Sequence, residues 1–498
     1  MGRSAQPRGR KVPSRDLNYA NRPPYIRHFT DGRRGEQNGN ETVVVAAVAA
    51  VAALAVVGDA AAKGGATAFS NTPLIATAPL GITTAPNANS TGDSEPAIAF
   101  GRDGAMAVDG LGWLPFQVNL WTGRFGATPS YFGAMDTDLN NVGNGRTTLG
   151  DEDADVEITS SGTTLLADLD LIVNPNFNAF QLGVNVTRCP AGTTSPSGCK
   201  HIFLDTAGAD REWITSSGKN AWLSYHDSRN SALIRVKRST DDGVTWSAAG
   251  SPIPGQGQAT ADATFNNSIG PIVADPTTPG AVYESYAAGE PQTKATSANY
   301  NNIFVSRSTD GGEHWTSTLV FHTAPFTRLN NFWPSLAVDP VTGTVYTAWT
   351  DQHGMWVSYS TDHGATWSMA LDVSNVATTV MPWLAARNGK VDLVYYGSTA
   401  SSPAATDAVW NAYDSQFRNG SWKVLLLSNT PNRVGPVCLS GSACPNNRNR
   451  ELLDLFEVAE DPVSGKAAVI YTDSTIDTWT NSSGVTKELP EIVLAFEN

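Results

Sequence analysis

The chain has few charged residues, few cysteines and no long amphipathic helical pattern. Asp, Glu, Lys and Arg make up 16% of its 498 residues, and only four residues are cysteine. Hydrophobic residues reach 41% and include 14 Trp, which is ample for a large core. Gly, Ser, Thr and Asn are plentiful, a composition typical of short strands joined by many turns. We therefore expect an all-β protein.

Positive charge is concentrated at the start of the chain. Residues 1–42 hold nine Arg or Lys against four acids, whereas the whole chain has a net charge of −14. The remainder is therefore more acidic still. Because phosphate binding needs stripes of Lys and Arg, this acidic body argues against nucleic acid as a partner.

One unbroken apolar run, Val43–Val57, follows the basic segment. It has about 15 residues, fewer than the ~20 that a membrane-spanning helix needs. The small residues Gly58–Ala62 come next and suit a cleavage site. We therefore predict that residues 1–62 are a secretion leader, with an uncleaved N-terminal anchor as the alternative. The protein is expected to be secreted or held at the cell surface.

The four cysteines form two close pairs, Cys189 with Cys199 and Cys438 with Cys444. Both pairs lie in segments rich in Gly, Pro and Ser. This pattern predicts two local disulfides, in agreement with export. A zinc site is disfavoured because no His lies at ligand spacing from either pair.

Three near-copies of one octapeptide occur in the middle of the chain: Ser239–Trp246, Ser308–Trp315 and Ser360–Trp367. Each copy has Asp third, Gly fifth and Trp eighth. The Asp can accept backbone hydrogen bonds, the Gly allows a positive φ, and the Trp can be buried between strands. The residues that recur in all three copies are Asp241, Gly243, Trp246, Asp310, Gly312, Trp315, Asp362, Gly364 and Trp367.

These octapeptides resemble the Asp-box, or BNR repeat, of sialidase-type β-propellers. A second pattern, two short apolar strands joined by a Gly turn, recurs around them. The turn glycines are Gly104, Gly162, Gly218, Gly280, Gly343, Gly389 and Gly465. Each unit reads as one four-stranded antiparallel blade, so we predict a β-propeller of seven blades. Sialidase catalytic domains have six, which is the alternative.

The predicted organisation has three parts. Residues 1–62 form the leader, residues 63–90 a linker, and residues 91–498 the propeller. The last strand, Glu491–Phe496, is expected to need an outer partner near Leu74–Thr83 to close the ring. We expect a monomer.

In a propeller, the repeated turn motifs and the remaining polar residues are expected on opposite faces. The Gly turns and octapeptides are expected on one face, in a structural role. The loops at the other face gather acids, arginines and Trp around the central channel, which suits a saccharide. This rim includes Asp93, Glu95, Asp151, Glu152, Asp153, Asp168, Asp210, Arg211, Glu212, His226, Asp227, Arg328, Trp333, Asp351, Trp383, Arg450, Glu451, Asp454 and Asp473.

Within the rim, we predict catalytic and binding roles for ten side chains. The acid/base candidates are Asp153, Glu212 and Glu451. The substrate-binding candidates are Arg211, His226, Asp227, Arg328, Trp333, Asp351 and Arg450. Alternatively, Asp227, Asp351 and Asp473 are repeated turn caps, and Asp151–Asp155 is either a solvated acidic turn or a structural calcium loop. No other metal and no organic cofactor is expected.

The resemblance implies a fold and a broad class, because the Phe/Tyr-Arg-Ile-Pro motif of sialidases does not occur. The leading hypothesis is a secreted, sialidase-like enzyme acting on a glycan or glycoconjugate, as a glycosidase. The second is a non-catalytic propeller that binds extracellular glycan or protein. The third, a polysaccharide lyase, rests on His226 beside Arg229.

Overall fold

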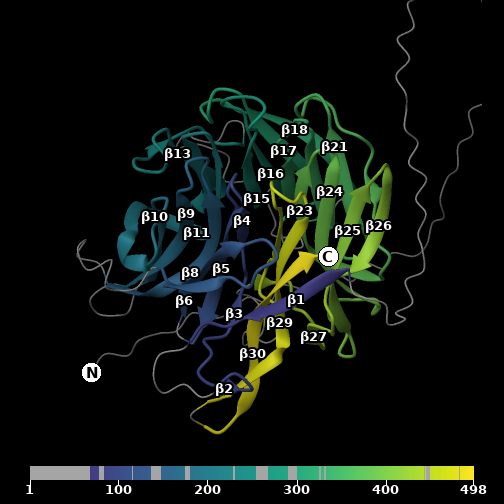
Figure 1. Ribbon diagram of the computed structural model, residues 1–498. Helices are drawn as coiled ribbons and strands as arrows, with labels where there is room; N and C mark the ends of the chain where they lie inside the picture. The colour runs from purple at the N-terminus through teal and green to yellow at the C-terminus, as the bar shows by residue number, and fades with distance from the viewer. Residues whose placement is uncertain are drawn as a thin grey trace, which may run out of the picture. The chain divides into compact units, whose positions relative to one another are not determined.

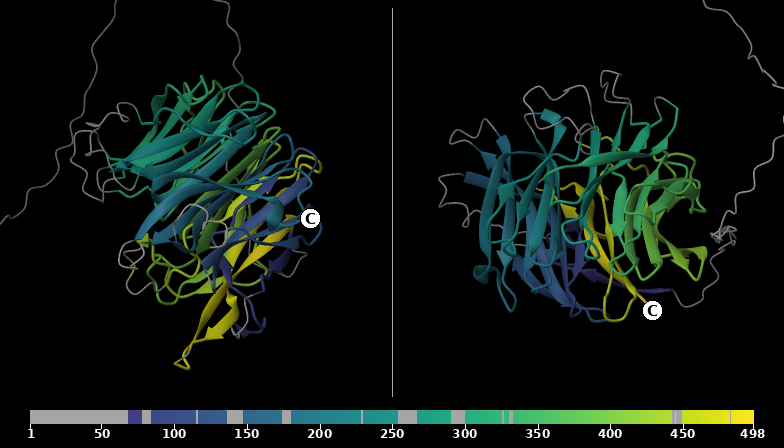
Figure 2. Two further views of the ribbon diagram at one scale, coloured as in Figure 1. Left: turned by 90° about the vertical axis from the view of Figure 1, so that its left-hand side faces the viewer. Right: turned by 90° about the horizontal axis from the view of Figure 1, so that it is seen from above.

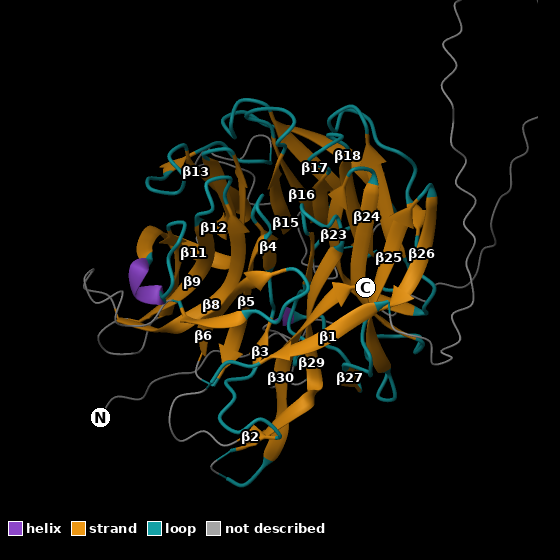
Figure 3. Cartoon of the chain, viewed as in Figure 1, coloured by secondary structure: helices purple, strands orange, loops and turns teal. Residues whose placement is uncertain are grey.

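The computed structural model describes an all-β chain (Figures 1 and 3). The described residues are 68–77, 84–114, 116–135, 147–173, 180–227, 230–253, 267–289, 300–324, 327–329, 333–441, 444, 449–481 and 483–498. The predicted leader, including Val43–Val57, lies outside them. Within the described ranges, the only helical element is a single 3₁₀ turn, Pro196–Gly198. No helix in this part of the chain is long and apolar enough to cross a bilayer.

Seven four-stranded antiparallel blades form a β-propeller, so the prediction of seven blades is confirmed and the six-bladed alternative is wrong. Blade 1 contains β4 (Ile98–Phe100), β5 (Ala105–Trp113), β6 (Phe116–Arg124) and β7 (Ser130–Ala134), with β3 (Asp93–Ser94) paired to β5. Blade 2 contains β8 (Thr147–Ile158), β9 (Thr164–Val173), β10 (Phe180–Cys189) and the first half of β11 (Lys200–Ser217). Blade 3 contains the second half of β11, β12 (Asn220–Asp227), β13 (Asn230–Ser239) and β14 (Ser247–Ala248).

The other four blades repeat this order. Blade 4 contains β15 (Asn267–Ala274), β16 (Val282–Ala288), β17 (Asn302–Ser308) and β18 (Thr316–His322). Blade 5 contains β19 (Ser335–Val338), β20 (Val345–Thr350), β21 (Met355–Ser360) and β22 (Leu371–Asp372). Blade 6 contains β23 (Thr378–Arg387), β24 (Lys390–Ser398), β25 (Val409–Arg418) and β26 (Ser421–Leu426), with β27 (Arg433–Val434) paired to β25. Blade 7 contains β28 (Glu457–Glu460), β29 (Ala467–Thr480), β30 (Thr486–Glu497) and β1 (Phe69–Leu74), with β2 (Thr84–Ala85) paired to β29.

The inner strands form a closed ring. Each inner strand contacts that of the next blade, and β28 of blade 7 contacts β4 of blade 1. Side chains on inner strands also accept hydrogen bonds from backbone N–H groups of the next inner strand. The acceptor and donor residues are Asp155 and Ile214 (2.8 Å), Thr215 and Ala274 (3.1 Å), Ser335 and Leu384 (2.9 Å), and Glu457 and Ile98 (3.0 Å). These bonds fix neighbouring blades in register.

Blade 7 is completed by a strand from the other end of the sequence. Strand β1 pairs antiparallel with β30, with Phe69 opposite Glu497 and Leu74 opposite Ile492. The expected partner, residues 74–83, overlaps β1 only at Leu74. Figure 2 shows the purple β1 beside the yellow strands of blade 7. This pairing covers the edge of β30, which would otherwise present unpaired backbone groups.

The strand order defines two faces. The turns between the first and second strands of each blade lie on one face, here called the lower face, together with those between the third and fourth. All seven predicted turn glycines have φ between 65° and 81°, a region that favours Gly. The opposite face, the upper face, carries the loops that lead into each inner strand.

The three octapeptides lie on the lower face, between the third and fourth strands of blades 3, 4 and 5. Their side chains make the same bonds in each copy. In the first, the Ser239 hydroxyl donates to Asp241 and accepts from Gly243 N–H, while Asp241 accepts from Thr245. In the second copy His314 replaces that Thr, and its Nδ1 lies 2.7 Å from Asp310. Each turn is therefore closed by its own side chains.

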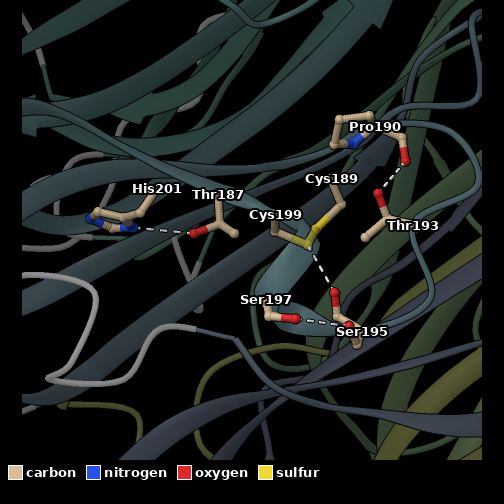
Figure 4. Close-up of a disulfide and its surroundings, with 8 residues drawn as sticks. All are labelled: Thr187, Cys189, Pro190, Thr193, Ser195, Ser197, Cys199 and His201. Carbon is tan, nitrogen blue, oxygen red and sulfur yellow. Dashed lines mark hydrogen bonds between the residues drawn. A yellow bond between two sulfur atoms is a disulfide. The ribbon is translucent and has the colours of Figure 1, made fainter.

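Both predicted disulfides are confirmed. Cys189 pairs with Cys199, and Cys438 with Cys444. The first closes the loop between β10 and β11 on the lower face (Figure 4). In that loop the Thr193 hydroxyl donates to the Pro190 carbonyl, so the disulfide and a local hydrogen bond constrain the same turn.

We expect Phe69→Ala to destabilise the propeller strongly. Phe69 is fully buried in the core of blades 6 and 7, and removing such a ring lowers the free energy of unfolding by about 3–5 kcal/mol. Ser70→Ala, at an exposed position of the same strand, is the matched control. Denaturant unfolding of both variants measures the effect. A loss no larger for Phe69→Ala than for the control would show that β1 does not hold blade 7.

Candidate functional site

The inner strands bring residues from distant parts of the sequence to one place. All seven run from the upper to the lower face, so residues at the start of each strand meet at the upper mouth of the channel. Glu95 precedes β4, Asp153 lies in β8, Arg211 lies in β11, and Asp454 precedes β28. These four come from blades that follow one another around the ring.

Arg211 is the centre of this group. Its side chain is 1% exposed, and its Nη2 lies 2.7 Å from the Glu95 carboxylate and 3.6 Å from that of Asp153. Its guanidinium carbon lies 4.7 Å from the ring centre of Trp333 and 5.3 Å from that of Trp213. A buried guanidinium is tolerated only with such compensation by carboxylates and aromatic faces.

Both partners of this ion pair have unusual backbone conformations. Glu95 has φ 49° and Arg211 has φ 58°, in the left-handed region that non-Gly residues rarely adopt. The pairing of β11 with β12 shifts register between Gly208 and Glu212, at the point where β11 passes from blade 2 to blade 3. Bulges of this kind redirect side chains, and strained residues cluster at functional sites. The two residues with these conformations are the partners of the 2.7 Å ion pair.

Glu212 is a buried carboxyl group beside this pair. It is fully buried, and within the described part of the chain neither of its side-chain oxygens has a hydrogen-bond partner. Burial raises the pKa of Glu212 well above its usual value, Asp153 raises it further, and Arg211 opposes the shift. The neutral acid is therefore the favoured form of Glu212.

Arg450 and Asp454 complete the group from the loop before blade 7. They are hydrogen-bonded to each other, and their side chains are 16% and 10% exposed. Burial alone would lower the pKa of Arg450, but the charges of Asp454, Glu95 and Asp153 hold it above the usual value. Burial raises the pKa of Asp454, against the effect of Arg450 and Arg211.

Burial also raises the pKa of Glu95 well above its usual value. Arg211 opposes this shift, while Asp153 and Asp454 add to it. The same residues thus act on one another electrostatically. We call Glu95, Asp153, Arg211, Glu212, Arg450 and Asp454 the rim cluster.

Three tryptophans lie at the same end of the channel. The ring of Trp213 lies 5.9 Å from that of Trp333 and 5.0 Å from that of Trp383. Further along the inner strands lies a cavity of about 300 Å³, which all seven of them line. On β23 the lining residues run from Trp383 to Arg387. On every strand that carries a rim-cluster residue, the residues that line the cavity come later in sequence. The rim cluster therefore lies above the cavity, at the level of the aromatic rings.

Five of the ten predicted site residues are brought together. They are Asp153, Arg211, Glu212, Trp333 and Arg450. The structure adds Glu95 and Asp454, which the sequence places on the rim without a role, and Trp213. The sequence signal for Trp213 is its place two residues after Arg211, because side chains two apart in a strand face the same side. The ion pairs of Glu95 and Asp454 depend on loop conformations that no sequence pattern encodes.

The other predicted site residues have different partners. Glu451 forms a 2.8 Å ion pair with Arg433, which also binds Glu488 on β30 at 2.6 Å. Glu451 is therefore part of a bridge to the hairpin of blade 7. Arg328 forms an isolated parallel bridge with Tyr300 through the backbone.

His226, Asp227 and Asp351 make local contacts at the ends of second strands. His226 lies 2.7 Å from Asn267, and burial lowers its pKa, which favours the neutral ring. Asp227 is bound by Arg235. Asp351 accepts from the N–H groups of His353 and Gly354, as a turn cap does.

The acidic segment 151–155 lies within strand β8, so the prediction of a turn or loop there is wrong. The side chains of Asp151 and Glu152 lie outside the described residues, as do Arg229 and Arg448. Among the described side chains, no group of three or more His, Cys, Asp or Glu has an arrangement that could hold a metal ion.

No protein-family model and no curated protein matches the chain. Solved structures with similar folds include a protein of unknown function from Dyadobacter fermentans (12% identity, 86% of this chain and 100% of that one, TM-score 0.43). Another is the GH93 α-L-arabinofuranosidase of Fusarium graminearum (13%, 70% and 97%, 0.44). A third is the intramolecular trans-sialidase from Ruminococcus gnavus (12%, 81% and 94%, 0.39). At this level of similarity, the matches do not indicate an activity for this chain.

We expect Glu212→Gln to change how stability depends on pH. A carboxyl group whose pKa is raised on folding contributes stability that is complete below about pH 4.5 and is lost as pH rises toward the folded value. The advantage of the variant over the wild type should therefore grow from pH 5 to pH 8 in denaturant unfolding. Ser70→Ala, at an exposed position and with no titratable group removed, should show no such trend. A constant difference for Glu212→Gln would contradict the buried neutral acid.

Proposed function

We propose that this protein is a glycan-active β-propeller, a secreted glycoside hydrolase of the sialidase-like, Asp-box class. The observation that carries the proposal is that two unlike carboxyl groups, Glu212 and Asp153, interact electrostatically at the channel mouth. Glu212 is buried and favours the neutral acid, whereas the side chain of Asp153 is 18% exposed. Most enzymes that cleave a glycosidic bond use two carboxyl groups, whose different environments give them different roles.

The roles follow from these environments. Glu212 donates its proton to the glycosidic oxygen as the bond to the leaving sugar breaks. Asp153 either attacks the anomeric carbon or removes a proton from the attacking water. Trp333, partly exposed beside Arg211, offers an aromatic face for a sugar ring. Arg211 and Arg450 hold the neighbouring carboxylates in place.

A non-catalytic glycan-binding propeller is the second candidate. It is favoured by one observation: Arg211 is 1% exposed and Glu212 is fully buried. A substrate must move other side chains before it reaches the acid. A binding protein would use only the partly exposed members of the rim, with Asp153, Trp333 and Arg450 in contact with the ligand.

The test is hydrolysis of a panel of aryl-glycosides, sialosides included, by the purified protein. We expect at least one substrate to be cleaved, and Glu212→Gln to lower kcat by about 10²- to 10⁴-fold, because the proton donor is lost. Asp310→Asn, in an octapeptide on the lower face, should keep full activity. Activity that survives in Glu212→Gln would refute the assigned acid. Binding of a glycan without cleavage of any substrate would favour the second candidate.

A further inference from the structure

We propose that the rim cluster accepts a saccharide unit without an acidic group and rejects sugars that carry a carboxylate. This inference rests on the proposed function and names the substrate class of the same site. Its basis is that both guanidinium groups of the rim cluster are already bound by carboxyl groups. Arg211 contacts Glu95 and Asp153, and Arg450 contacts Asp454.

Within the rim cluster, neither guanidinium group is open to a ligand carboxylate. Arg211 is 1% exposed and lies against the rings of Trp213 and Trp333. Arg450 is 16% exposed, but Asp454 accepts its hydrogen bond. To pair with either arginine, an acidic sugar must displace a protein carboxyl group that is held by the fold. Bidentate recognition of a carboxylate needs accessible donors, and the guanidinium group of Arg211 is buried.

The rim cluster also contains more acids than bases, four carboxyl groups against two guanidinium groups. Further buried acids accept backbone hydrogen bonds nearby: Asp155 and Glu457 on the inner strands β8 and β28, and Asp109 on β5, the second strand of blade 1. The charge of Arg211 acts on both Asp109 and Glu457. An additional carboxylate would therefore compete with several protein carboxyl groups for the same positive charge. Asp153 has the most exposed side chain of the four carboxyl groups, so an incoming carboxylate meets its like charge there.

Glu212 is the independent sign that a ligand belongs here. It is fully buried, and within the described part of the chain both oxygens are without a hydrogen-bond partner. A buried carboxyl group without a partner can be satisfied by a water or by a ligand. A sugar hydroxyl can both accept from and donate to a neutral carboxyl group. A ligand carboxylate can accept from the neutral acid but has no proton to donate, and it would lie near Asp153, whose charge acts on the same carboxyl group.

The experiment compares related saccharides with and without a carboxylate group. The probes are lactose with 3′-sialyllactose, and methyl-esterified with de-esterified oligogalacturonides, in a wider panel of such matched pairs measured by glycan array and calorimetry. We expect the uncharged member of the recognised pair to bind at least tenfold more tightly. Equal or tighter binding of the acidic member would overturn this inference and leave the proposed function standing. No binding by any member would overturn both.

A charge variant tests the cause. Asp454→Asn releases Arg450 from its partner, so it should shift the ratio of acidic to uncharged binding toward the acidic member by about tenfold. Asp310→Asn, on the lower face, should leave that ratio unchanged. If Asp454→Asn does not fold, Asp153→Asn removes a neighbouring charge at a partly exposed position and should shift the ratio in the same direction. An unchanged ratio in a folded variant would overturn the electrostatic explanation.

Discussion

The closure of the seven inner strands into a ring is the constraint on which the rest of the structure depends. Backbone pairing within a blade cannot position one blade against another. That is done by side chains such as Asp155 and Glu457, which accept hydrogen bonds from the next inner strand, and by the pairing of β1 with β30. Only with the ring closed do Glu95, near the start of the propeller, and Asp454, near its end, face the same arginines.

Closure also explains why buried charges are tolerated at the channel mouth. Desolvating Arg211 and its carboxylates is unfavourable, and the left-handed conformations of Glu95 and Arg211 add backbone strain. A fold fixed by extensive strand pairing can absorb both. Residues that break local rules without benefit to stability are expected where function requires them. The raised pKa of Glu212 follows from the same burial.

The architecture was largely predictable from the sequence, because it repeats. The Gly turns and octapeptides encode local hairpins, and their number gave seven blades. The site was predictable only in part. Knowing which loops enter the inner strands was enough to place Asp153, Arg211, Glu212 and Arg450 at one face. It was not enough to pair them, because the partners come from different blades and irregular loops.

The remaining predicted site residues make contacts that depend on loop and strand geometry, which the sequence does not reveal. Glu451 is adjacent to Arg450, yet it binds Arg433, since the loop before β28 turns its side chain toward the hairpin of blade 7. Asp351 resembles a rim acid in sequence but caps its own turn. The acidic run 151–155 reads as a turn, whereas it belongs to the long strand β8, whose register shifts are set by pairing with β9.

The most direct test of the central claim is a crystal structure of the Glu212→Gln variant with a bound oligosaccharide from the recognised pair. The claim is that the rim cluster at the upper mouth is the glycan site. It predicts a sugar ring beside Trp333, with hydroxyl groups within hydrogen-bond distance of Asp153 and of the side chain at position 212. A saccharide bound instead in the cavity below Trp383, or on the lower face among the octapeptides, would contradict it.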